Sequence, residues 1–271
     1  MPKGGTPYMP SQYLLDAYEP RRYMRYFEEI TRIPHNTEDE AHLAAYIREV
    51  AKTAGLESYQ DPHGNVLVRM PATEGYENAP AVLFQGHMDM VAVKEADCDK
   101  DMEKEGLDLE INGDYISAKG TSLGGDDGIA VAYTLAVLDD EEMAHPPIEA
   151  IFTVNEEIGM LGAALNYGSD LKGRLFMNMD SEDEGVFTVS CAGGASVICK
   201  IPYETETVNA SVIEIKMTGF AGGHSGVEII KGRLNANCAM ARVLLSLFNE
   251  VGAIKGKLMD GDAQWLKVET K

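Results

Sequence analysis

The sequence of 271 residues has 23 Lys and Arg against 44 Asp and Glu, a formal net charge of −21, and 45% of its residues are apolar. This length can bury a sizeable core without disulfides, and it fits one large domain with a second piece. Phosphate backbones and anionic lipids repel such an acidic chain, so we expect neither a nucleic acid nor a membrane partner.

The composition also indicates the cellular compartment of the protein and the type of side chain that could bind a metal ion. No run of about 18 apolar residues is present, and residues 1–10 lack the apolar core of a signal peptide, which favours a cytoplasmic protein. Cys98, Cys191, Cys199 and Cys238 are widely spaced and form no CxxC pair. They are therefore interpreted as reduced packing residues, and a zinc site would have to use His and carboxylate ligands.

Two helices and a hairpin-like stretch are predicted over the first 70 residues. Pro20 is well placed to start a helix over 21–31. Thr37 and Glu40 match the capping-box pattern for a second helix, which Gly55 ends. A turn and a strand are predicted next, over residues 61–65 and 66–70.

From residue 81 onward, short apolar runs alternate with an apolar helix. We predict strands over 81–84, 148–154 and 175–179, and a helix over 129–138. Continuous apolar strands between apolar helices indicate the α/β class, with a mainly parallel mixed sheet sandwiched by helices. Ligand sites in such sheets lie beyond the carboxyl ends of the strands.

The pattern changes in the last third of the chain. Residues 186–203 and 212–219 alternate apolar and polar positions, which is typical of half-exposed antiparallel strands. A helix over about 233–249 and a strand-like stretch over 257–271 follow. We therefore expect a catalytic metal-binding domain over residues 1–185 and a partial α+β lid domain over residues 186–271.

Carboxylates and one His follow the predicted strands. They are His87 and Asp89 after the first strand, Glu156 and Glu157 after the second, Asp180 after the third, and Asp126 with Asp127 at the start of the apolar helix. Each is weak evidence alone, since surface His, paired Glu and helix-capping Asp are ordinary. Their recurrence at one sheet edge indicates bound cations, because burying uncompensated charge is costly.

The spacing of these residues makes chemical sense. His87 and Asp89 are two apart in an extended segment, so they can act as a metal ligand and the carboxylate that orients it. The neighbours Glu156 and Glu157 can divide their roles between a metal and a bound water. Asp126, preceded by glycines that allow close backbone approach, can bridge two ions.

Four segments carry a resemblance: FQGHMDMV (84–91), LGGDDGI (123–129), TVNEEIGM (153–160) and NMDSE (178–182). They resemble the metal-site motifs of the aminoacylase/carboxypeptidase family of two-zinc peptidases, most closely its aminoacyl-histidine (Xaa-His) dipeptidase branch. The segments GFAGGHSG (219–226) and GRLNAN (232–237) also resemble that branch. The likeness extends from about residue 20 to the end.

The resemblance implies a set of metal ligands and a backbone feature. The implied ligands are His87 and Asp180 on one zinc, Glu157 on the other, and Asp126 bridging both. The Asp126–Asp127 peptide bond is cis in such proteins. Because His and carboxylates also suit manganese and cobalt, these ions remain alternatives to zinc.

The resemblance also implies catalytic roles. Asp89 would orient His87, Glu156 would be the general base, and His224 would reach the substrate from the lid, which can also form a homodimer interface. Arg233 and Asn237, one helical turn apart, could meet a substrate carboxylate, although ordinary helix-surface polarity explains them almost as well.

Members of this family continue past the point that corresponds to residue 271, and a His near their C-terminus completes the second zinc site. We therefore expect a fragment or a natural truncation whose Glu157 zinc site lacks one ligand. The expected function is metal-dependent hydrolysis of Xaa-His dipeptides. A related aminoacylase or carboxypeptidase activity, or metal binding without turnover, stays open, and the sequence does not determine side-chain preference.

Overall fold

The computed structural model describes residues 13–163, 171–181, 183–190, 198, 200, 202, 211–222, 229–251, 255–258 and 266–270. The chain divides into two compact units, residues 1–191 and 192–271. His224 lies outside the described residues, as does most of the 186–203 stretch, of which residues 186–190 are exposed and form no strand. Among the described residues, no helix has the length and apolarity needed to span a bilayer.

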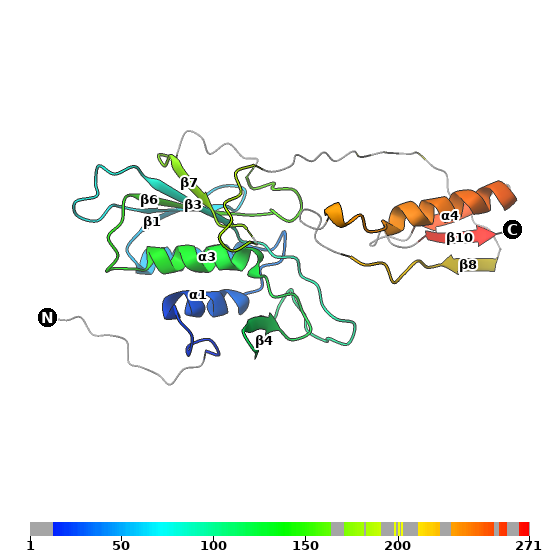
Figure 1. Ribbon diagram of the computed structural model, residues 1–271, viewed down its shortest axis with the longest axis horizontal. Helices are drawn as coiled ribbons and strands as arrows, with labels where there is room; N and C mark the ends of the chain where they lie inside the picture. Colours follow the sequence, from blue (N-terminus) through cyan, green and yellow to red (C-terminus); the bar gives the residue numbers. More distant parts are fainter. Residues whose placement is uncertain are drawn as a thin grey trace. The chain divides into compact units, whose positions relative to one another are not determined.

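The first unit contains three helices and seven strands in its described part (Figure 1). These are α1 (Arg21–Thr31), α2 (Ala41–Thr53), β1 (Glu57–Gln60), β2 (Val66–Met70), β3 (Val82–His87), β4 (Leu109–Asn112), β5 (Tyr115–Ala118), α3 (Gly125–Leu138), β6 (Ile148–Thr153) and β7 (Leu175–Asn178). Strands β4 and β5 form a separate antiparallel hairpin.

The other five strands form one mixed sheet in the order β1-β2-β6-β3-β7. Strand β3 is parallel to both β6 and β7, whereas β2 is antiparallel to β1 and to β6. The sheet is therefore mixed, as expected, and its parallel part is confined to β6, β3 and β7. Because parallel strands end at the same edge, the residues that follow these three strands meet there.

One face of the sheet packs against the three helices. Side chains from all these elements form a single buried cluster that includes Phe27 of α1, Ile47 of α2, Val131 of α3, Val68 of β2 and Phe152 of β6. In Figure 1, α3 and α1 lie on the same side of the sheet. On the opposite face, the described residues contribute a smaller cluster, formed by Leu67, Leu83 and Ile151 with Leu171 against it.

The start of α2 differs from the capping-box prediction. The helix begins after Glu40, whose side chain makes no capping hydrogen bond. The hydroxyl of Thr37 donates instead to Oδ2 of Asp89, 3.1 Å away. Glu38 has a φ of +72°, which turns the chain between Thr37 and the helix. A carboxylate acceptor is stronger than a neutral one, so the hydroxyl of Thr37 serves the Asp89 loop rather than the helix.

Strand β3 is longer than predicted, because it continues past Phe84 to His87. Gly86 makes this possible. A Cβ atom there would lie 2.7 Å from Cβ of Ala130 and 2.8 Å from Oδ2 of Asp127, so any side chain would collide with the start of α3. The absence of a side chain lets the strand carry His87 directly against the first turn of that helix.

The second unit contains β8 (Ser211–Ile215), the short 3₁₀ helix η1 (Ile229–Lys231), α4 (Ala236–Val251), β9 (Lys255–Leu258) and β10 (Leu266–Thr270). Its strands form an antiparallel sheet in the order β8-β10-β9. Helix α4 begins three residues later than predicted, because Oδ1 of Asn235 caps it by accepting the N–H of Cys238 at 3.0 Å.

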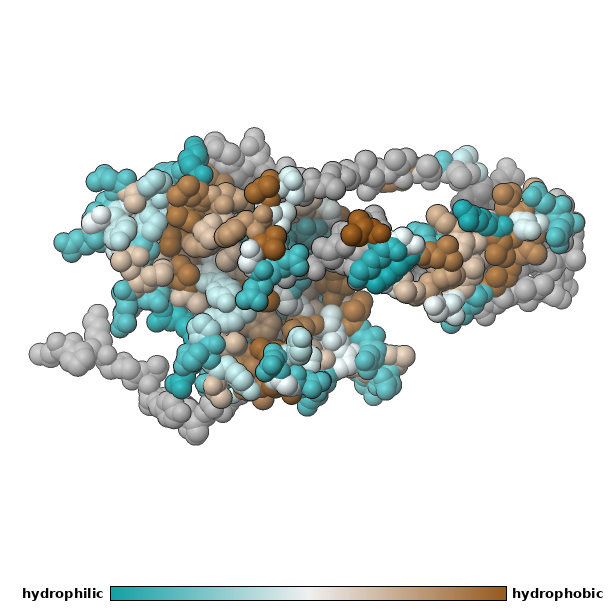
Figure 2. Space-filling model, viewed as in Figure 1, coloured by the Kyte–Doolittle hydropathy of each residue, from teal (hydrophilic) through white to brown (hydrophobic). Residues whose placement is uncertain are grey.

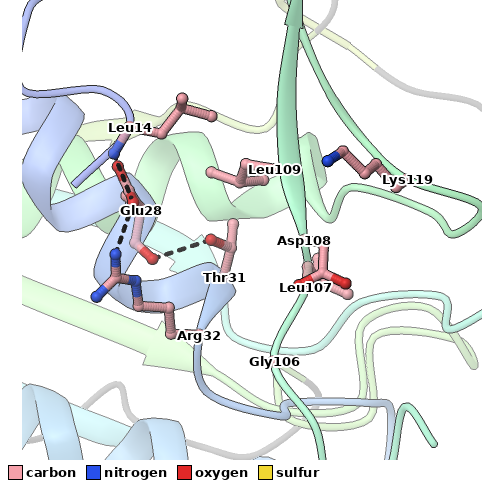
Figure 3. A pocket seen from close by; sticks show the side chains of 9 residues that line it. All are labelled: Leu14, Glu28, Thr31, Arg32, Gly106, Leu107, Asp108, Leu109 and Lys119. Atoms are coloured by element: carbon pink, nitrogen blue, oxygen red, sulfur yellow. Dashed lines mark hydrogen bonds and ion pairs between the residues drawn. The ribbon is translucent and has the colours of Figure 1, made fainter. Parts of the chain in front are cut away.

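Two surface features belong to the first unit. Apolar residues are exposed on it (Figure 2), among them Leu175, Phe176 and Met177 of the edge strand β7. A cavity of about 510 Å³ lies between α1, the 106–109 segment and the chain before α1 (Figure 3). None of the predicted site residues lines this cavity.

Candidate metal centre

The carboxyl ends of β6, β3 and β7 bring the predicted metal-binding side chains together. Ligand atoms of His87, Asp126 and Glu157 all lie within 4.8 Å of one another, and those of His87, Asp127 and Asp180 do so as well. Because His87 belongs to both groups, they form one cluster. Asp127, for which the resemblance implies no metal contact, joins the four predicted ligands.

His87 has only 1% of its side chain exposed. Its Nε2 lies 2.9 Å from Oδ1 of Asp126, and its Nδ1 lies 2.8 Å from the main-chain carbonyl oxygen of Asp89. A carbonyl oxygen can only accept, so Nδ1 is the donor in that contact and Nε2 faces the carboxylates. Metal-binding His residues typically have this arrangement, with the second ring nitrogen donating to a carbonyl or carboxylate.

Asp89 was predicted to orient His87, and its carboxylate has a second set of contacts. Oδ1 of Asp89 lies 3.5 Å from Nδ1 of His87, farther than the carbonyl of the same residue. Oδ1 accepts the N–H of Glu156 at 2.9 Å, and Oδ2 accepts the N–H of Glu157 at 3.2 Å. Asp89 therefore contacts His87 mainly through its backbone and supports the glutamate pair through its carboxylate.

Asp126 and Asp127 occupy the distorted first turn of α3. Both have non-helical backbone angles, and the bond between them is cis, as the resemblance implied. The side chain of Asp127 is buried and its Oδ2 accepts the N–H of His87 at 3.1 Å, whereas half of the Asp126 side chain is exposed. Asp127 thus ties the helix to the end of β3, and Asp126 faces Nε2 of His87.

Glu156 and Glu157 lie in the turn that follows β6. Oε2 of Glu156 is 3.9 Å from Nε2 of His87, the nitrogen that also faces Asp126. The side chain of Glu156 is 28% exposed, so this carboxylate remains accessible from solvent. Glu157 is the member of the pair whose ligand atom belongs to the cluster.

Burial, followed by the crowding of negative charge, shifts the pKa values of the acids in this cluster. Burial, together with the neighbouring charge of Asp180, raises the pKa of Asp127 to about 8 against the opposing effect of His87. Burial and neighbouring acids also raise the pKa of Glu156 and of Glu157. Burial alone would lower the pKa of His87, but nearby carboxylates outweigh it and raise the pKa to about 11. The cluster therefore favours additional positive charge.

The donors fit a divalent cation. One imidazole with several carboxylates suits zinc, and it also admits manganese or cobalt. Ligand atoms bonded at about 2.1 Å to one ion lie at most about 4.2 Å apart, so groups within 4.8 Å require only small side-chain movements. Nε2 of His87 points at the carboxylates that would complete such a site.

The predicted substrate-binding residues belong to the second unit. Arg233 precedes α4, and Asn237 lies in the first turn of that helix. Both side chains are exposed. Because the helix begins at Ala236, the prediction that Arg233 and Asn237 lie one turn apart on a helix is wrong.

The fold around this cluster is that of peptidases. No family model matches the chain. The structure is similar to an aminoacylhistidine dipeptidase from Vibrio alginolyticus, with a TM-score of 0.65 and 32% identity over 95% of this chain and 54% of the other. It also has the fold of the aminopeptidase PepT from Bacillus cereus, with a TM-score of 0.52 and 19% identity over 92% of this chain and 65% of the other.

The sequence comparison agrees. The chain is 40% identical over 232 residues to the cytosol non-specific dipeptidase of Escherichia coli, an alignment that covers 85% of this chain and 48% of that protein. The chain thus spans about half the length of the dipeptidases that it matches. Both comparisons confirm the resemblance to dipeptidases that was stated from the motifs, and the structural comparison includes an aminoacylhistidine dipeptidase.

Proposed function

We propose that the chain takes part in metal-dependent hydrolysis of dipeptides of the Xaa-His type, with the cluster around His87 as the metal centre. The observation that carries the proposal is the meeting of His87 with four carboxylates where the ends of three parallel strands meet the start of α3. The similarity to two proteins named as dipeptidases supports peptides as substrates. We further propose a cytoplasmic location, since one of those relatives is named for the cytosol.

The proposed cofactor is a pair of Zn²⁺ ions, with Mn²⁺ or Co²⁺ as alternatives. His87 and Asp180 would hold one ion, Glu157 the other, and Asp126 both. Bound ions of this kind acidify water and polarise a peptide carbonyl. Asp127 would fix the position of His87 through the main-chain hydrogen bond at 3.1 Å.

Glu156 is the proposed general base. Its carboxylate lies near Nε2 of His87, remains accessible, and is anchored through its backbone N–H by Asp89. In this role Glu156 takes a proton from the attacking water and returns it to the nitrogen of the leaving amine. Without a bound ion, burial and the neighbouring acids Asp180, Asp89 and Asp126 raise the pKa of Glu156 above its ordinary value.

The second unit is proposed to act as a lid. His224 would donate a hydrogen bond to the oxyanion, and Arg233 and Asn237 would meet the substrate carboxylate. We also propose that the lid can mediate a homodimer, and that residues 1–185 and 186–271 are the catalytic and lid domains.

The test is hydrolysis by the purified chain supplied with Zn²⁺, Mn²⁺ or Co²⁺, on a panel of Xaa-His dipeptides, other dipeptides and N-acyl amino acids. Glu156→Gln should lower kcat by about 10²- to 10⁴-fold, because a general base contributes that much. The metal content of this variant should stay unchanged, and the exposed Glu142→Gln should behave as the parent chain.

The substrate panel separates the candidate functions. Preferential cleavage of Xaa-His dipeptides supports the proposal, and preferential cleavage of N-acyl amino acids favours the aminoacylase alternative. Metal binding with no hydrolysis of any substrate would overturn the proposed activity and leave metal binding without turnover.

A further inference from the structure

Residues 36–40, which we call the clasp, contact two of the loops around the proposed metal centre, the one after β3 and the one after β6. The clasp lies between α1 and α2. Asn36 forms a parallel β-bridge with Met90, and the N–H of Thr37 donates to the carbonyl of Met90 at 3.3 Å. The Thr37 hydroxyl also contacts the Asp89 carboxylate, so the clasp holds the loop that follows His87.

A second set of hydrogen bonds joins the clasp to the turn after β6. Oε1 of Glu40 accepts the N–H of Asn155 at 3.0 Å. In the opposite direction, the N–H of Glu38 donates to Oδ1 of Asn155 at 3.1 Å and also approaches Oε1 of Glu40 at 3.4 Å. Glu40 is buried, with 6% exposed, although it lies 115 residues from Asn155 in the sequence. These bonds fix the residue immediately before Glu156.

The backbone at both ends of this connection has an unusual conformation. Glu38 has a φ of +72° and Asn155 a φ of +55°. Residues with a Cβ atom seldom adopt positive φ, and surrounding contacts must hold them there; Asn is among the residues that tolerate it best. The positive φ of Asn155 reverses the chain directly after β6, and its reciprocal bonds with the clasp maintain that reversal.

We propose that Glu40 is a positioning residue for the turn that presents Glu156 and Glu157, acting through Asn155. The inference rests on the proposed function, because it assigns Glu40 to the same centre. Glu40 belongs to neither candidate ligand group; its carboxylate oxygen accepts the N–H of Asn155, and the next two N–H groups of the turn donate to Asp89. The hydrogen-bond acceptor, rather than the charge, is what this role requires.

The test compares Glu40→Ala with Glu40→Gln in the full 271-residue chain. Gln keeps an acceptor oxygen and Ala removes it. Hydrogen–deuterium exchange of the metal-free chain, followed on peptides covering residues 154–160, should be about tenfold faster in Glu40→Ala, because the partly buried N–H of Asn155 loses its acceptor. Glu40→Gln should stay within about twofold of the parent chain.

Metal affinity and kinetics provide the second readout. Residues that support metal ligands typically change affinity or activity by about 10- to 100-fold when removed. Glu40→Ala should therefore weaken Zn²⁺ binding, measured by competition with a chromophoric chelator, and lower kcat by about tenfold or more with little change in KM. Glu40→Gln should keep both the Zn²⁺ affinity and kcat close to those of the parent chain.

A matched control is available at the other end of β6. Glu149 is also buried, and its Oε2 accepts the N–H groups of Lys172 and Gly173, each at 2.7 Å. Glu149→Ala should lower the thermal midpoint without accelerating exchange over residues 154–160. If Glu40→Ala does not fold, Glu40→Leu provides the comparison with Glu40→Gln, because Leu fills similar space but offers no acceptor for the N–H of Asn155.

Three results would overturn the proposal. In the first, residues 154–160 exchange as slowly in Glu40→Ala as in the parent chain. In the second, they exchange as fast in Glu40→Gln as in Glu40→Ala. In the third, Glu149→Ala accelerates their exchange as much as Glu40→Ala does. The absence of hydrolysis in every chain with every metal would instead overturn the proposed function, and the exchange measurements on the metal-free chain would still decide the role of Glu40.

Discussion

Carboxylates on α1 and carboxylates at the carboxyl edge of the sheet differ in what balances their charge. On α1, Glu29 accepts hydrogen bonds from Arg25 and from the hydroxyls of Tyr13 and Tyr46. Its neighbour Glu28 pairs with Arg32 and also accepts two backbone N–H groups. These acids are neutralised by groups that the chain itself supplies.

The acids at the sheet edge gather around a single imidazole. The pKa of Asp127 rises to about 8 there, mainly because of burial. For Glu29, burial also pushes the pKa up, but the hydrogen bonds from Tyr46, Arg25 and Tyr13 outweigh it and lower the pKa. Asp127, Glu156 and Glu157 at the sheet edge have raised pKa values, whereas the pKa values of Asp89 at the same edge and of Glu29 on α1 are lowered. The acids with raised pKa values are the ones that would gain by binding a cation.

Removing His87 tests this difference between the two acid clusters with the largest predicted effect. We expect His87→Ala to weaken binding of Zn²⁺ by about 10²-fold or more, because His87 belongs to both ligand groups. Arg25→Ala, which disrupts the α1 cluster instead, should leave Zn²⁺ affinity unchanged. Competition with a chromophoric chelator measures both affinities.

Thermal melting gives an independent measure of the same prediction. At a metal concentration of about 100 times Kd, binding to the folded state stabilises it by about 2.7 kcal/mol. The parent chain and Arg25→Ala should therefore melt at a higher temperature with Zn²⁺ than without it, and His87→Ala should not. A metal-induced shift in His87→Ala as large as in the parent chain would contradict the assignment of the centre.

The second prediction concerns pH and the α1 cluster. Because the folded-state pKa of Glu29 is lowered, its ionised form stabilises the folded state above the ordinary carboxyl pKa. That stabilisation is lost as the pH falls through the folded-state pKa. Glu29→Gln should therefore cost about 1.5–3 kcal/mol at neutral pH, the contribution of hydrogen bonds to a charged group, and progressively less in acid.

Urea unfolding at a series of pH values measures this cost. The exposed Glu142→Gln is the control and should cost little at any pH. A Glu29→Gln cost that stays constant from neutral pH down through the acidic range would show that the ionised carboxylate is not what the cluster stabilises.

The sequence predicted the elements whose local pattern decides their structure. Helix α1 has the predicted bounds, because Pro20 marks its start and the residue before Pro34 disfavours its continuation. The convergence of acids was also predicted, since it depends only on parallel strands ending at one edge. Strands β4 and β5 were not predicted, because each has only four residues and an unremarkable pattern around Gly113.

The contacts that hold the candidate site in place could not be predicted from local pattern. Thr37 and Glu40 match a capping box at the expected spacing, yet they bond to Asp89 and Asn155, which lie 52 and 115 residues away. The contact of the Asp89 carboxylate with the glutamate turn likewise depends on tertiary packing. Local patterns identify the donors and acceptors, and the fold determines how they pair.

The smallest predicted effect concerns β7, the edge strand that leads to Asp180. Nδ2 of Asn178 donates to Oε1 of Gln85 at 2.6 Å, and Nε2 of Gln85 donates to Oγ1 of Thr153 at 3.2 Å. This row of side chains joins β7, β3 and β6 just before their carboxyl ends. Asn178 lies two residues before Asp180, so the row also limits where that acid can lie relative to His87.

Asn178→Ala removes one exposed hydrogen bond, which contributes about 0.5–1.5 kcal/mol. We expect the thermal midpoint to change little, and Zn²⁺ affinity to fall by about two- to tenfold, because Asp180 would be less well held. Asn112→Ala, on the separate β4–β5 hairpin, should leave the affinity unchanged. A fall in Zn²⁺ affinity as large as that in His87→Ala would contradict this prediction, because it would mean that Asn178 belongs to the metal centre rather than supporting it.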